Sequence, residues 1–372
     1  MTARRLIAAV VIDGVECPAT DVTVDQSSNQ SPDTFSATLA LNGLPPGRDA
    51  AYFSSADEIP CDVIVAVGMS GGLLFSGSAD KVDVDFEAGN VKLSGRDKSK
   101  DLIESKATKT HKNKSSKEVV DEYAGEAGLE VDADEDAGKA GKQYRQEWNR
   151  VTDLSSKWSA IQHMADREGK HAFVQKNKLY YRNLDETDLG AVEVDYQGQS
   201  PFGHAEGNFI GLKVSRNLEL AKTTKVRVRS YNSETEERHD ETETLGGSGK
   251  ERTYDYRHAG MTNGQAKKTA KKRLREHTRH ERTADVTLPG NPDISPLMKL
   301  LITGTGTAWD QDYHIDRCGH RISGDKYDVH ITAKNSSKGR GGAGGASGAS
   351  ESGGAAVGSQ QMAQASYPRE GA

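Results

Sequence analysis

Residues Thr283–Lys334 read TADVTLPGNPDISPLMKLLITGTGTAWDQDYHIDRCGHRISGDKYDVHITAK and contain four successive strand patterns. Polar and apolar residues alternate along Thr283–Leu288, as in a strand. The strand is expected to end at Pro289-Gly290-Asn291-Pro292, because the two prolines cannot donate hydrogen bonds to a sheet. Leu297–Thr303 resumes as an apolar strand. Two further strands alternate on either side of the turn Ser323-Gly324-Asp325, through Tyr313, Ile315, Arg317 and then Tyr327, Val329, Ile331. The stretch predicts a β-rich unit, and it carries no catalytic constellation.

The composition predicts several small cores and no nucleic-acid footprint. A length of 372 residues suggests two or three domains. Only 34% of residues are hydrophobic and 6% are aromatic, so the cores should be small, as in β-barrels. The 49 Lys and Arg against 55 Asp and Glu give a formal charge of −6, whereas adhesion to nucleic acid requires a basic surface.

The cysteines and the first residues indicate where the protein is made. Cys17, Cys61 and Cys318 are far apart and lack CxxC spacing, so we expect reduced cysteines in a protein made in the cytosol. The start, MTARRLIAAVVIDGVE, has an apolar run only over Leu6–Ile12 and no A-x-A site, which favours a strand over a signal peptide. No run reaches the roughly 18 apolar residues of a membrane span, so direct membrane insertion is not expected.

Residues 1–104 are predicted to form a first antiparallel β-barrel domain. Phe35–Leu41 shows the pattern most clearly, with alternate apolar side chains inward. The other expected strands are Leu6–Ile12, Asp21–Val24, Cys61–Val67, Leu73–Phe86 and Asn90–Ser94. Asp97 is placed to cap a short helix over Lys98–Ser105.

Residues 105–204 are predicted to form an inserted α/β domain. Ser115 and Glu118 form a capping-box pattern for a helix that ends at Gly128. A second helix starts at Ser155/Ser156 and ends at Gly169, with core positions at Trp158, Ile161, Met164 and Ala165. A hairpin follows, with strands His171–Gln175 and Leu179–Arg182.

Residues 205–335 are predicted to form a second β-barrel domain with a flanking helix at about 263–282. Thr262 and Gln265 form the capping box of that helix. Polar Ser233–Glu251 is expected to be a loop between strands, and the additional strands are Phe209–Leu218, Lys225–Ser230 and Arg252–Arg257. Residues 336–372 are rich in Gly, Ser and Ala and are predicted to form a flexible, disordered tail.

Three motif fragments resemble parts of known sites. Gly68–Gly72 matches G-x-S-x-G, but a strand rather than a helix follows, which favours a hairpin turn. Asp132, Asp134 and Asp136 have the spacing of a calcium loop, but its glycine and its twelfth-position glutamate are absent. A solvated acidic loop is favoured there, with adventitious cation binding left open. Gly304-Thr305-Gly306 lacks the helix of a dinucleotide fingerprint.

The basic run Lys267–Arg282 has two interpretations. It could bind nucleic acid, or it could be a helix docked through Ala266, Ala270 and Leu274 with its charges facing solvent or an acidic neighbour. The second is favoured, because one helix without aromatic platforms is a thin footprint. The eleven histidines show no zinc pattern. We therefore assign no catalytic, cofactor-binding or metal residue and expect no cofactor, although the paired carboxylates of a glycosidase stay open.

Three segments in order, Phe75–Ile103, Ser155–Tyr181 and Thr283–Thr332, resemble the phage baseplate or tail hub family. That family includes the late control D and Mu-type tail hubs and is related to the N-terminal base of VgrG. The resemblance is carried by Gly95-Arg96-Asp97, and further by Met164-Ala165, Gly169, Gly290-Asn291-Pro292, Tyr313-His314-Ile315 and His320.

The resemblance implies a structural virion protein rather than an enzyme. Three copies, each with two similar barrels, would form a pseudo-sixfold ring that joins the tail tube or distal tail protein to the central spike. The tape-measure protein and baseplate wedge proteins are further implied partners, and DNA would pass through the lumen without specific binding. Such a protein is synthesised and assembled in the bacterial cytoplasm. We also expect a net negative lumen and a C-terminal tail that tethers the spike.

The sequence leaves two alternatives open. One is a tail-tip peptidoglycan hydrolase, for which the chain has no spare segment of domain size. The other is the base of a type VI-like secretion spike. A full-length VgrG has an OB domain and a β-helix after the second barrel, and their absence after residue 335 argues against a full-length VgrG.

Overall fold

The computed structural model describes most of the chain up to Asn335. The described residues are 6–28, 31–68, 70–108, 111, 114–134, 156–168, 170–182, 190–201, 203–218, 220, 222–232, 236–247, 250–296 and 298–335. They fall within one compact unit, Met1–Arg340. The fold is mainly β, as predicted. The tail at 336–372, Asp136 and Gly169 lie outside the described residues.

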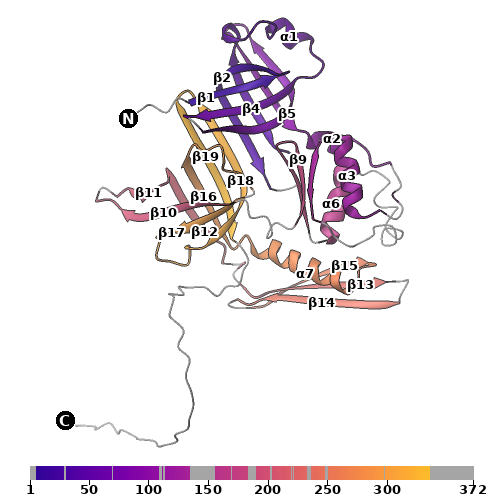
Figure 1. The fold of residues 1–372 in the computed structure, drawn as a ribbon. Helices are drawn as coiled ribbons and strands as arrows, with labels where there is room; N and C mark the ends of the chain where they lie inside the picture. The colour runs from indigo at the N-terminus through magenta and orange to yellow at the C-terminus, as the bar shows by residue number, and fades with distance from the viewer. Residues whose placement is uncertain are drawn as a thin grey trace, which may run out of the picture. The chain divides into compact units, whose positions relative to one another are not determined.

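The N-terminal β module, Leu6–Asp97, is a closed antiparallel barrel (Figure 1). Its strands are β1 (Leu6–Ile12), β2 (Val15–Ser27), β3 (Thr34–Ala40), β4 (Pro60–Val67), β5 (Ser70–Asp85) and β6 (Asn90–Asp97). They pair in the order β1-β4-β5-β6-β3-β2, and β1 also pairs with β2, which closes the ring. The loop from β3 to β4 contains η1 (Leu41–Gly43) and α1 (Ala50–Ser55).

Alternation of side chains explains this barrel. Along β3, Phe35, Ala37 and Leu39 are buried between partly or fully exposed neighbours, as period-2 patterning requires. Val91 and Leu93 do the same along the neighbouring β6, and together they line one core. Cys17 and Cys61 belong to this core, and all three cysteines are buried and unpaired.

The C-terminal β module consists of strands on both sides of an insertion. They are β10 (Ala191–Gln199), β11 (Ala205–Gly207), β12 (Gly211–Arg216), β16 (Arg282–Pro289), β17 (Lys299–Thr303), β18 (Asp312–Ser323) and β19 (Lys326–Asn335). The order is β11-β10-β17-β18-β19-β16-β12. β10 runs parallel to β17, an exception to the antiparallel pattern that the sequence predicts. Tyr313, Ile315, Val329 and Ile331 alternate into its core, as predicted.

Both modules use the same chain connectivity. If β1 to β6 are equated in order with β10, β12, β16, β17, β18 and β19, five pairings of the first set recur in the second. The recurring pairs in the C-terminal β module are β10–β17, β17–β18, β18–β19, β19–β16 and β16–β12. The sixth, which closes the first barrel, has no counterpart between β10 and β12 in the described part of the chain.

A continuous sheet joins the modules through a seam between β2 and β18. Asp21–Ser27 pairs antiparallel with Arg317–Ser323, so that Asp21 lies opposite Ser323. The first part of β2 pairs with β1 and its second part with β18. In the same way, β18 pairs first with β17 and then with β2. The two barrels expected from the sequence are therefore connected by main-chain hydrogen bonds.

Between the modules, the chain forms a separate α/β core. Its helices are α2 (Ser99–Glu104), α3 (Ser116–Glu126) and α6 (Lys157–Glu168), and its strands are β7 (Glu130–Ala133), β8 (His171–Gln175) and β9 (Lys178–Arg182). The Ser115–Glu118 capping box is present with both of its hydrogen bonds. Trp158, Ile161 and Met164 are buried on α6, as predicted. In Figure 1 these helices lie beside the small sheet.

A second insertion, between β12 and β16, forms a sheet covered by a helix (Figure 1). It consists of β13 (Thr224–Asn232), β14 (Glu237–Leu245), β15 (Arg252–Ala259) and α7 (Asn263–Thr278). Ala266 and Ala270 of α7 pack on Val226 and Val228 of β13. The Thr262–Gln265 capping box opens α7, which ends at Thr278, four residues before the predicted end.

Two local predictions were wrong. The loop expected over Ser233–Glu251 contains strand β14, an exposed strand with charged residues at most positions. Pairing with β13 stabilises it, since Asp240 lies opposite Arg229 and bonds to Arg227. The N-cap of α2 is Lys98 rather than Asp97, although the Asp97 carboxylate does accept the Ser99 N–H at 3.1 Å.

Candidate functional site: the seam between two β modules

The structure places the described parts of the three motif fragments in turns and ion pairs. Gly68 has a positive φ of 66° in the turn between β4 and β5, where Val67 pairs with Ser70, so the hairpin prediction is confirmed. Asp132 and Asp134 form ion pairs with Arg182. Among the described residues, no group of three His, Cys, Asp or Glu side chains could hold a metal ion. The Gly304–Gly306 segment is a turn held by the Asp310 carboxylate.

Part of the basic run forms ion pairs within the protein, whereas Lys267, Lys268 and Lys271 are exposed. The Lys272 ammonium is buried and lies 2.8 Å from Asp166 of α6. Arg273 contacts both Asp166 and Glu276, and Arg279 lies 2.8 Å from Asp316 of β18. These ion pairs tie α7 to the α/β core and to the C-terminal β module. The docked-helix interpretation is confirmed, with acidic neighbours for these three cations.

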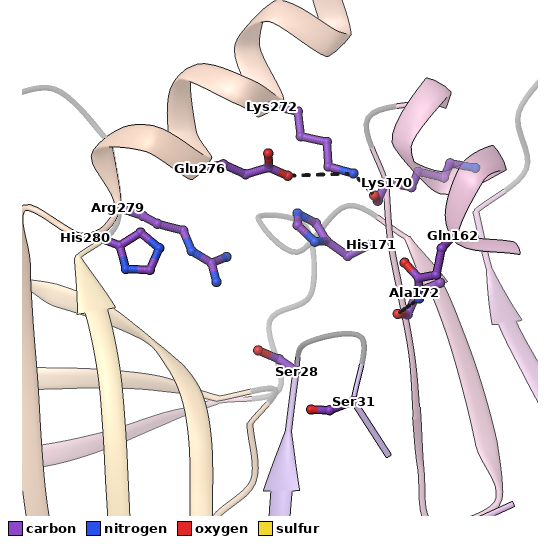
Figure 2. Close-up of a pocket in the computed structure, with 10 residues that line it drawn as sticks. All are labelled: Ser28, Ser31, Gln162, Lys170, His171, Ala172, Lys272, Glu276, Arg279 and His280. Carbon is purple, nitrogen blue, oxygen red and sulfur yellow. Dashed lines mark hydrogen bonds and ion pairs between the residues drawn. The ribbon is translucent and has the colours of Figure 1, made fainter. Parts of the chain in front are cut away.

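A pocket of about 400 Å³ opens where α7 ends (Figure 2). Its lining comes from the loop after β2, from α6 and β8, and from α7 and the two residues after it. The lining residues are Ser28, Ser31, Gln162, Lys170, His171, Ala172, Lys272, Glu276, Arg279 and His280. Figure 2 shows the Arg279 guanidinium and the His171 ring pointing into the space between these elements.

A buried hydrogen-bond chain holds the seam from the side of β18. His320 is fully buried, and its Nδ1 lies 2.9 Å from the Tyr327 hydroxyl. Its Nε2 lies 3.2 Å from the Ile294 carbonyl oxygen. Burial lowers the pKa of His320 to about 4, so the ring is neutral at neutral pH. Burial raises the pKa of Tyr327 and of Cys318. The group is therefore uncharged and structural.

Two buried carboxyl groups hold the seam from the side of β2. Asp33 Oδ1 accepts the Ser27 N–H at 2.9 Å, and Asp97 Oδ2 accepts the Asp33 N–H at 3.3 Å. Asp97 Oδ1 also accepts the Ser99 hydroxyl at 2.5 Å. Burial raises the pKa of Asp97 to about 6, and burial together with the Asp97 charge raises the pKa of Asp33 well above its usual value. The pair fixes the end of β2 against the start of α2.

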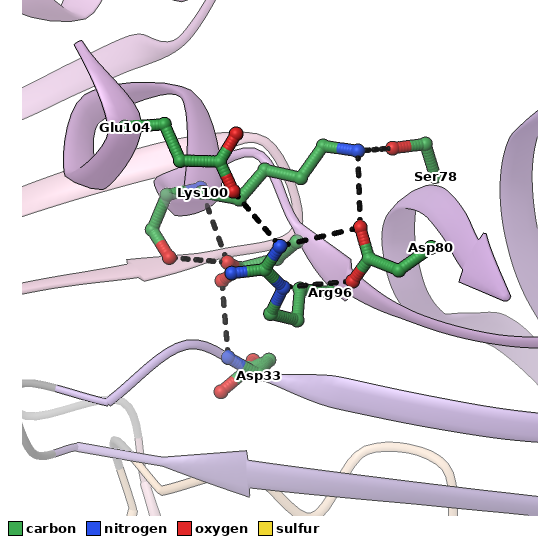
Figure 3. Close-up of polar contacts among 8 residues, drawn as sticks. Asp33, Ser78, Asp80, Arg96, Lys100 and Glu104 are labelled. Carbon is green, nitrogen blue, oxygen red and sulfur yellow. Dashed lines mark hydrogen bonds and ion pairs between the residues drawn. The ribbon is translucent and has the colours of Figure 1, made fainter. Parts of the chain in front are cut away.

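Arg96 lies next to this pair and connects three elements (Figure 3). Its Nε donates to Asp80 Oδ2 at 2.7 Å on β5, and its Nη2 donates to Glu104 at 2.9 Å on α2. Lys100 of α2 bonds Ser78 and lies 3.4 Å from Asp80. The Gly95-Arg96-Asp97 motif thus orients the first helix of the α/β core on the N-terminal β module.

The motif glycines mark places without room for a side chain. A Cβ on Gly95 would lie 2.0 Å from the Ser78 carbonyl oxygen, at a bulge between β5 and β6. A Cβ on Gly290 would lie 2.1 Å from the Tyr327 ring, and the Gly290 N–H donates to the Tyr327 carbonyl at 2.8 Å. Gly290 therefore lets the turn after β16 close over the seam tyrosine.

Sequence patterns identified some of these residues but not their partners. His320, Gly290 and Gly95 stood out as motif positions, and the structure gives each a packing role. The seam was missed, because Asp21 and Ser323 are 302 positions apart. The pocket was missed because its lining comes from three separated stretches. The described residues join the modules through buried hydrogen bonds and ion pairs.

The fold is shared with tail proteins of phages and prophages. A tail protein from Neisseria meningitidis MC58 matches with a TM-score of 0.64 and 12% identity, over 89% of this chain and 96% of that one. A prophage MuSo2 43 kDa tail protein from Shewanella oneidensis matches with a TM-score of 0.63 and 13% identity, over 88% and 98% of the two chains.

A secretion protein has the same fold. It is an E. coli component of the type VI secretion system, described as similar to the T4 tail proteins gp27 and gp5. It matches with a TM-score of 0.54 and 8% identity, over 90% of this chain and 79% of that one. At these identities the likeness establishes the fold, which this chain shares with the two tail proteins and the secretion component.

The family follows from a sequence model. A model described as YQBQ-like matches residues 22–334, and the chain belongs to this family. No curated protein matches the sequence. None of the described helices combines the length and apolar character that a transmembrane span requires.

Proposed function

We propose that this protein is the structural baseplate hub of a phage or phage-derived tail, part of the virion and not an enzyme. Three copies would form a ring between the tail tube and the central spike and would line the channel. Its proposed domains are a first β domain, 1–104, an α/β insert, 105–204, a second β domain, 205–335, and a flexible tail, 336–372. Strand β10 (Ala191–Gln199) pairs with β17, so the C-terminal β module begins before residue 205. The likeness to tail proteins supports the role in a tail.

The repeated strand connectivity is the observation that carries this proposal. Each chain supplies two modules in which β2 and β12, or β5 and β18, occupy equivalent places. Three copies would therefore present six related modules around one axis. Such a ring can match a sixfold tube on one side and a threefold spike on the other, and closure requires heterologous interfaces between copies.

The edges of the C-terminal β module supply a surface for such interfaces. β12 pairs with β16 on one side, and in the described part of the chain its other edge has no strand partner. Two exposed apolar side chains flank this strand, Ile210 at 64% exposure and Leu218 at 69%. An unpaired edge with apolar flanks is a typical docking surface for a strand of another subunit.

The remaining partners follow from the position of a hub. The tail tube or distal tail protein would contact one face of the ring and the central spike the other, with wedge proteins at the periphery. The tape-measure protein and DNA would pass through a net negative lumen without specific binding, because like charges repel. The tail 336–372 would tether the spike.

Oligomeric mass and symmetry test the proposal. The purified chain has a mass of 40.1 kDa, and mass photometry at rising concentration should show a population at three times that value. Electron microscopy of assembled particles should place three copies at the junction of tube and spike. A stable dimer, or copies that do not encircle the tail axis, would contradict the proposal.

Charge substitutions at the free edge make the test specific. Ile210→Lys and Leu218→Lys place charges on exposed positions, so they should leave the fold intact and abolish trimer formation. Phe86→Lys is the matched control, because Phe86 is 77% exposed in a turn of the closed barrel, which has no free edge. If all three variants assemble equally well, the β12 edge is not the interface.

An enzyme of the tail tip is the competing function. Zymography with purified peptidoglycan separates the two, since a clearing zone would favour a hydrolase. A place at the base of a secretion spike is the other alternative, supported by the fold shared with the E. coli secretion component. Detection of the protein in purified virions, or with a secretion apparatus in a strain without phage particles, distinguishes these two.

A further inference from the structure

The inserted sheet β14-β13-β15 is covered by α7 on one face. Val226 and Val228 of β13 pack against α7 there, with two tyrosines of β15 beside them, and Figure 1 shows α7 along that side. Because side chains alternate along a strand, the residues between them lie on the opposite face, which we call the open face. The register of the three strands gives its members as Lys225, Arg227, Arg229, Tyr231, Arg238, Asp240, Thr242, Thr244, Thr253, Asp255, Arg257 and Ala259.

The open face carries two arginines that no acid of the described chain neutralises. Three of its cations have acidic partners: Lys225 lies 3.7 Å from Glu251, Arg229 lies 3.5 Å from Asp255, and Arg227 pairs with Asp240. Arg238 and Arg257 have none among the described residues, and Glu236, in the turn before β14, forms no ion pair with Arg238. The formal charge of −6 for the whole chain therefore conceals two unpaired guanidinium groups on one surface.

Arg238 and Arg257 flank an exposed aromatic ring. Tyr231 is 49% exposed, and Arg238 lies directly opposite it on β14, with its guanidinium carbon 6.0 Å from the ring centroid. Arg257 is the diagonal neighbour of Tyr231 on β15, because Tyr231 pairs with Ala259 and Arg257 pairs with Arg229. The three side chains form a basic aromatic cluster at one end of the open face.

This combination is typical of surfaces that bind single strands. Exposed aromatic rings stack on unpaired bases, and neighbouring arginines bind the phosphates and contribute cation–π contacts. The open face also has three threonines, Thr242, Thr244 and Thr253, whose hydroxyl groups can donate to phosphate oxygens. A duplex would use the cations but not the ring, since its bases are stacked on one another.

We propose that the open face binds single-stranded nucleic acid without sequence preference. Tyr231 stacks on a base, and Arg238 and Arg257 bind the phosphates on either side of it. The acidity of the whole chain does not prevent this, because charges more than about 8 Å away are largely screened at physiological ionic strength. The site is formed within one chain, so it depends neither on the hub role nor on trimer formation.

The test is the binding of a fluorescein-labelled oligothymidylate of twelve nucleotides to the full chain, followed by fluorescence anisotropy at pH 7. The anisotropy should rise to saturation, and the logarithm of the association constant should fall linearly with the logarithm of the salt concentration. Tyr231→Ala should weaken this binding about tenfold, through the loss of one stacked base. A duplex of twelve base pairs is the matched probe, and its affinity should not change in this variant. Equal losses for both probes, or no loss for either, would overturn the proposal.

Arginine variants locate the phosphate contacts. Arg238→Gln and Arg257→Gln should each reduce the slope of the salt dependence by about 0.7, the contribution of one phosphate contact on a single strand. Arg321→Gln is the control and should leave the slope unchanged, because Arg321 is an exposed arginine of β18 outside the open face. Equal reductions in all three variants, or in none, would contradict the assignment.

A competing polyanion separates nucleic acid from an acidic protein segment. Unlabelled oligothymidylate should displace the labelled strand. A polyglutamate peptide of twelve residues should require a concentration about tenfold higher or more, since it has no rings to stack on Tyr231. Displacement by both competitors at the same concentration would identify a docking surface for acidic protein and refute the proposal. These readouts report binding to one chain, so the hub proposal keeps its own test by oligomeric mass.

Discussion

The two β modules share their connectivity but differ at one junction. In the N-terminal β module, β1 runs antiparallel to β4 and also pairs with β2, so the barrel closes. In the C-terminal β module, the equivalent β10 runs parallel to β17, and in the described residues it does not meet β12. The reversed direction of β10 therefore goes together with the missing β10–β12 pairing in the C-terminal β module. The same topology can give a self-contained barrel or a module with edges available to other chains.

Among these predictions, Gly95→Ala should cause the largest loss of stability, and it acts within the closed N-terminal barrel. Its Cβ would lie 2.0 Å from the Ser78 carbonyl oxygen, in a bulge where backbone cannot move away. We expect a loss of about 3 kcal/mol in the free energy of unfolding, measured by urea denaturation. Gly211→Ala in β12 is the matched control, because its nearest atom is 3.8 Å away at the open edge. An equal loss of unfolding free energy in Gly95→Ala and Gly211→Ala would mean that the closed barrel is no less tolerant of an added side chain than the open edge.

The pH dependence of stability should have opposite signs on the two sides of the seam. The pKa of His320 is lowered from 6.5 to about 4, so its contribution is complete above pH 6.5 and is lost as the pH falls towards 4. By pH 5 the loss is on the order of 2 kcal/mol. The pKa of Asp97 is raised from 3.8 to about 6, so the stability associated with its protonated form is complete below 3.8 and is lost as the pH rises through 6.

Single substitutions separate these two titrations. His320→Asn should remove the acid-side loss, and Asp97→Asn should remove the acid-side gain, in urea denaturation series between pH 5 and pH 8. If His320→Asn leaves the slope of stability against pH unchanged, then His320 does not titrate as its burial indicates.

Tyr327→Phe should have a moderate effect and tests the seam itself. It removes the hydroxyl that bonds His320 Nδ1 at 2.9 Å and leaves a buried imidazole nitrogen without that partner. We expect a loss of about 1–2 kcal/mol in the free energy of unfolding. Tyr196→Phe in β10 is the control and should be close to neutral. A neutral Tyr327→Phe would mean that packing alone holds the seam.

The smallest effect is expected in the inserted sheet. Asp240→Asn on β14 removes a surface ion pair with Arg227, which solvent and salt screen. The denaturation midpoint should therefore change little, and any change should disappear in 1 M salt. A large, salt-independent loss would show that β14 depends on this pair rather than on its ladder with β13.

Local patterns predicted most of the strands but not their long-range pairing. Phe35, Ala37 and Leu39 alternate so regularly that a half-buried strand was evident, and the Thr262–Gln265 box marked the start of α7. Strand β14 was missed because its alternation is between charged and polar residues. The reversal of β10 could not be predicted, because strand direction depends on the connections before and after it and not on the side-chain period.

The candidate site was less accessible from sequence. His320 and Gly290 are recognisable as motif positions, but the tyrosine that contacts both lies on the other strand of the hairpin. The pocket depends on His171 and Arg279, which come from parts of the chain that meet only after folding. The sequence therefore identified the basic residues on one side of the pocket, and only the structure showed which other elements enclose it.

The length of chain between the seam strands has a consequence for biosynthesis. Asp21 leaves the ribosome 302 residues before its neighbour Ser323, so the end of β2 waits with an unpaired edge while the rest of the protein is made. Contacts of such separation slow folding and expose nascent chains to mispairing. All strands of the amino-terminal barrel end by Asp97, whereas β18 and then β19 are the last strands to be made, so the seam can pair only near the end of synthesis.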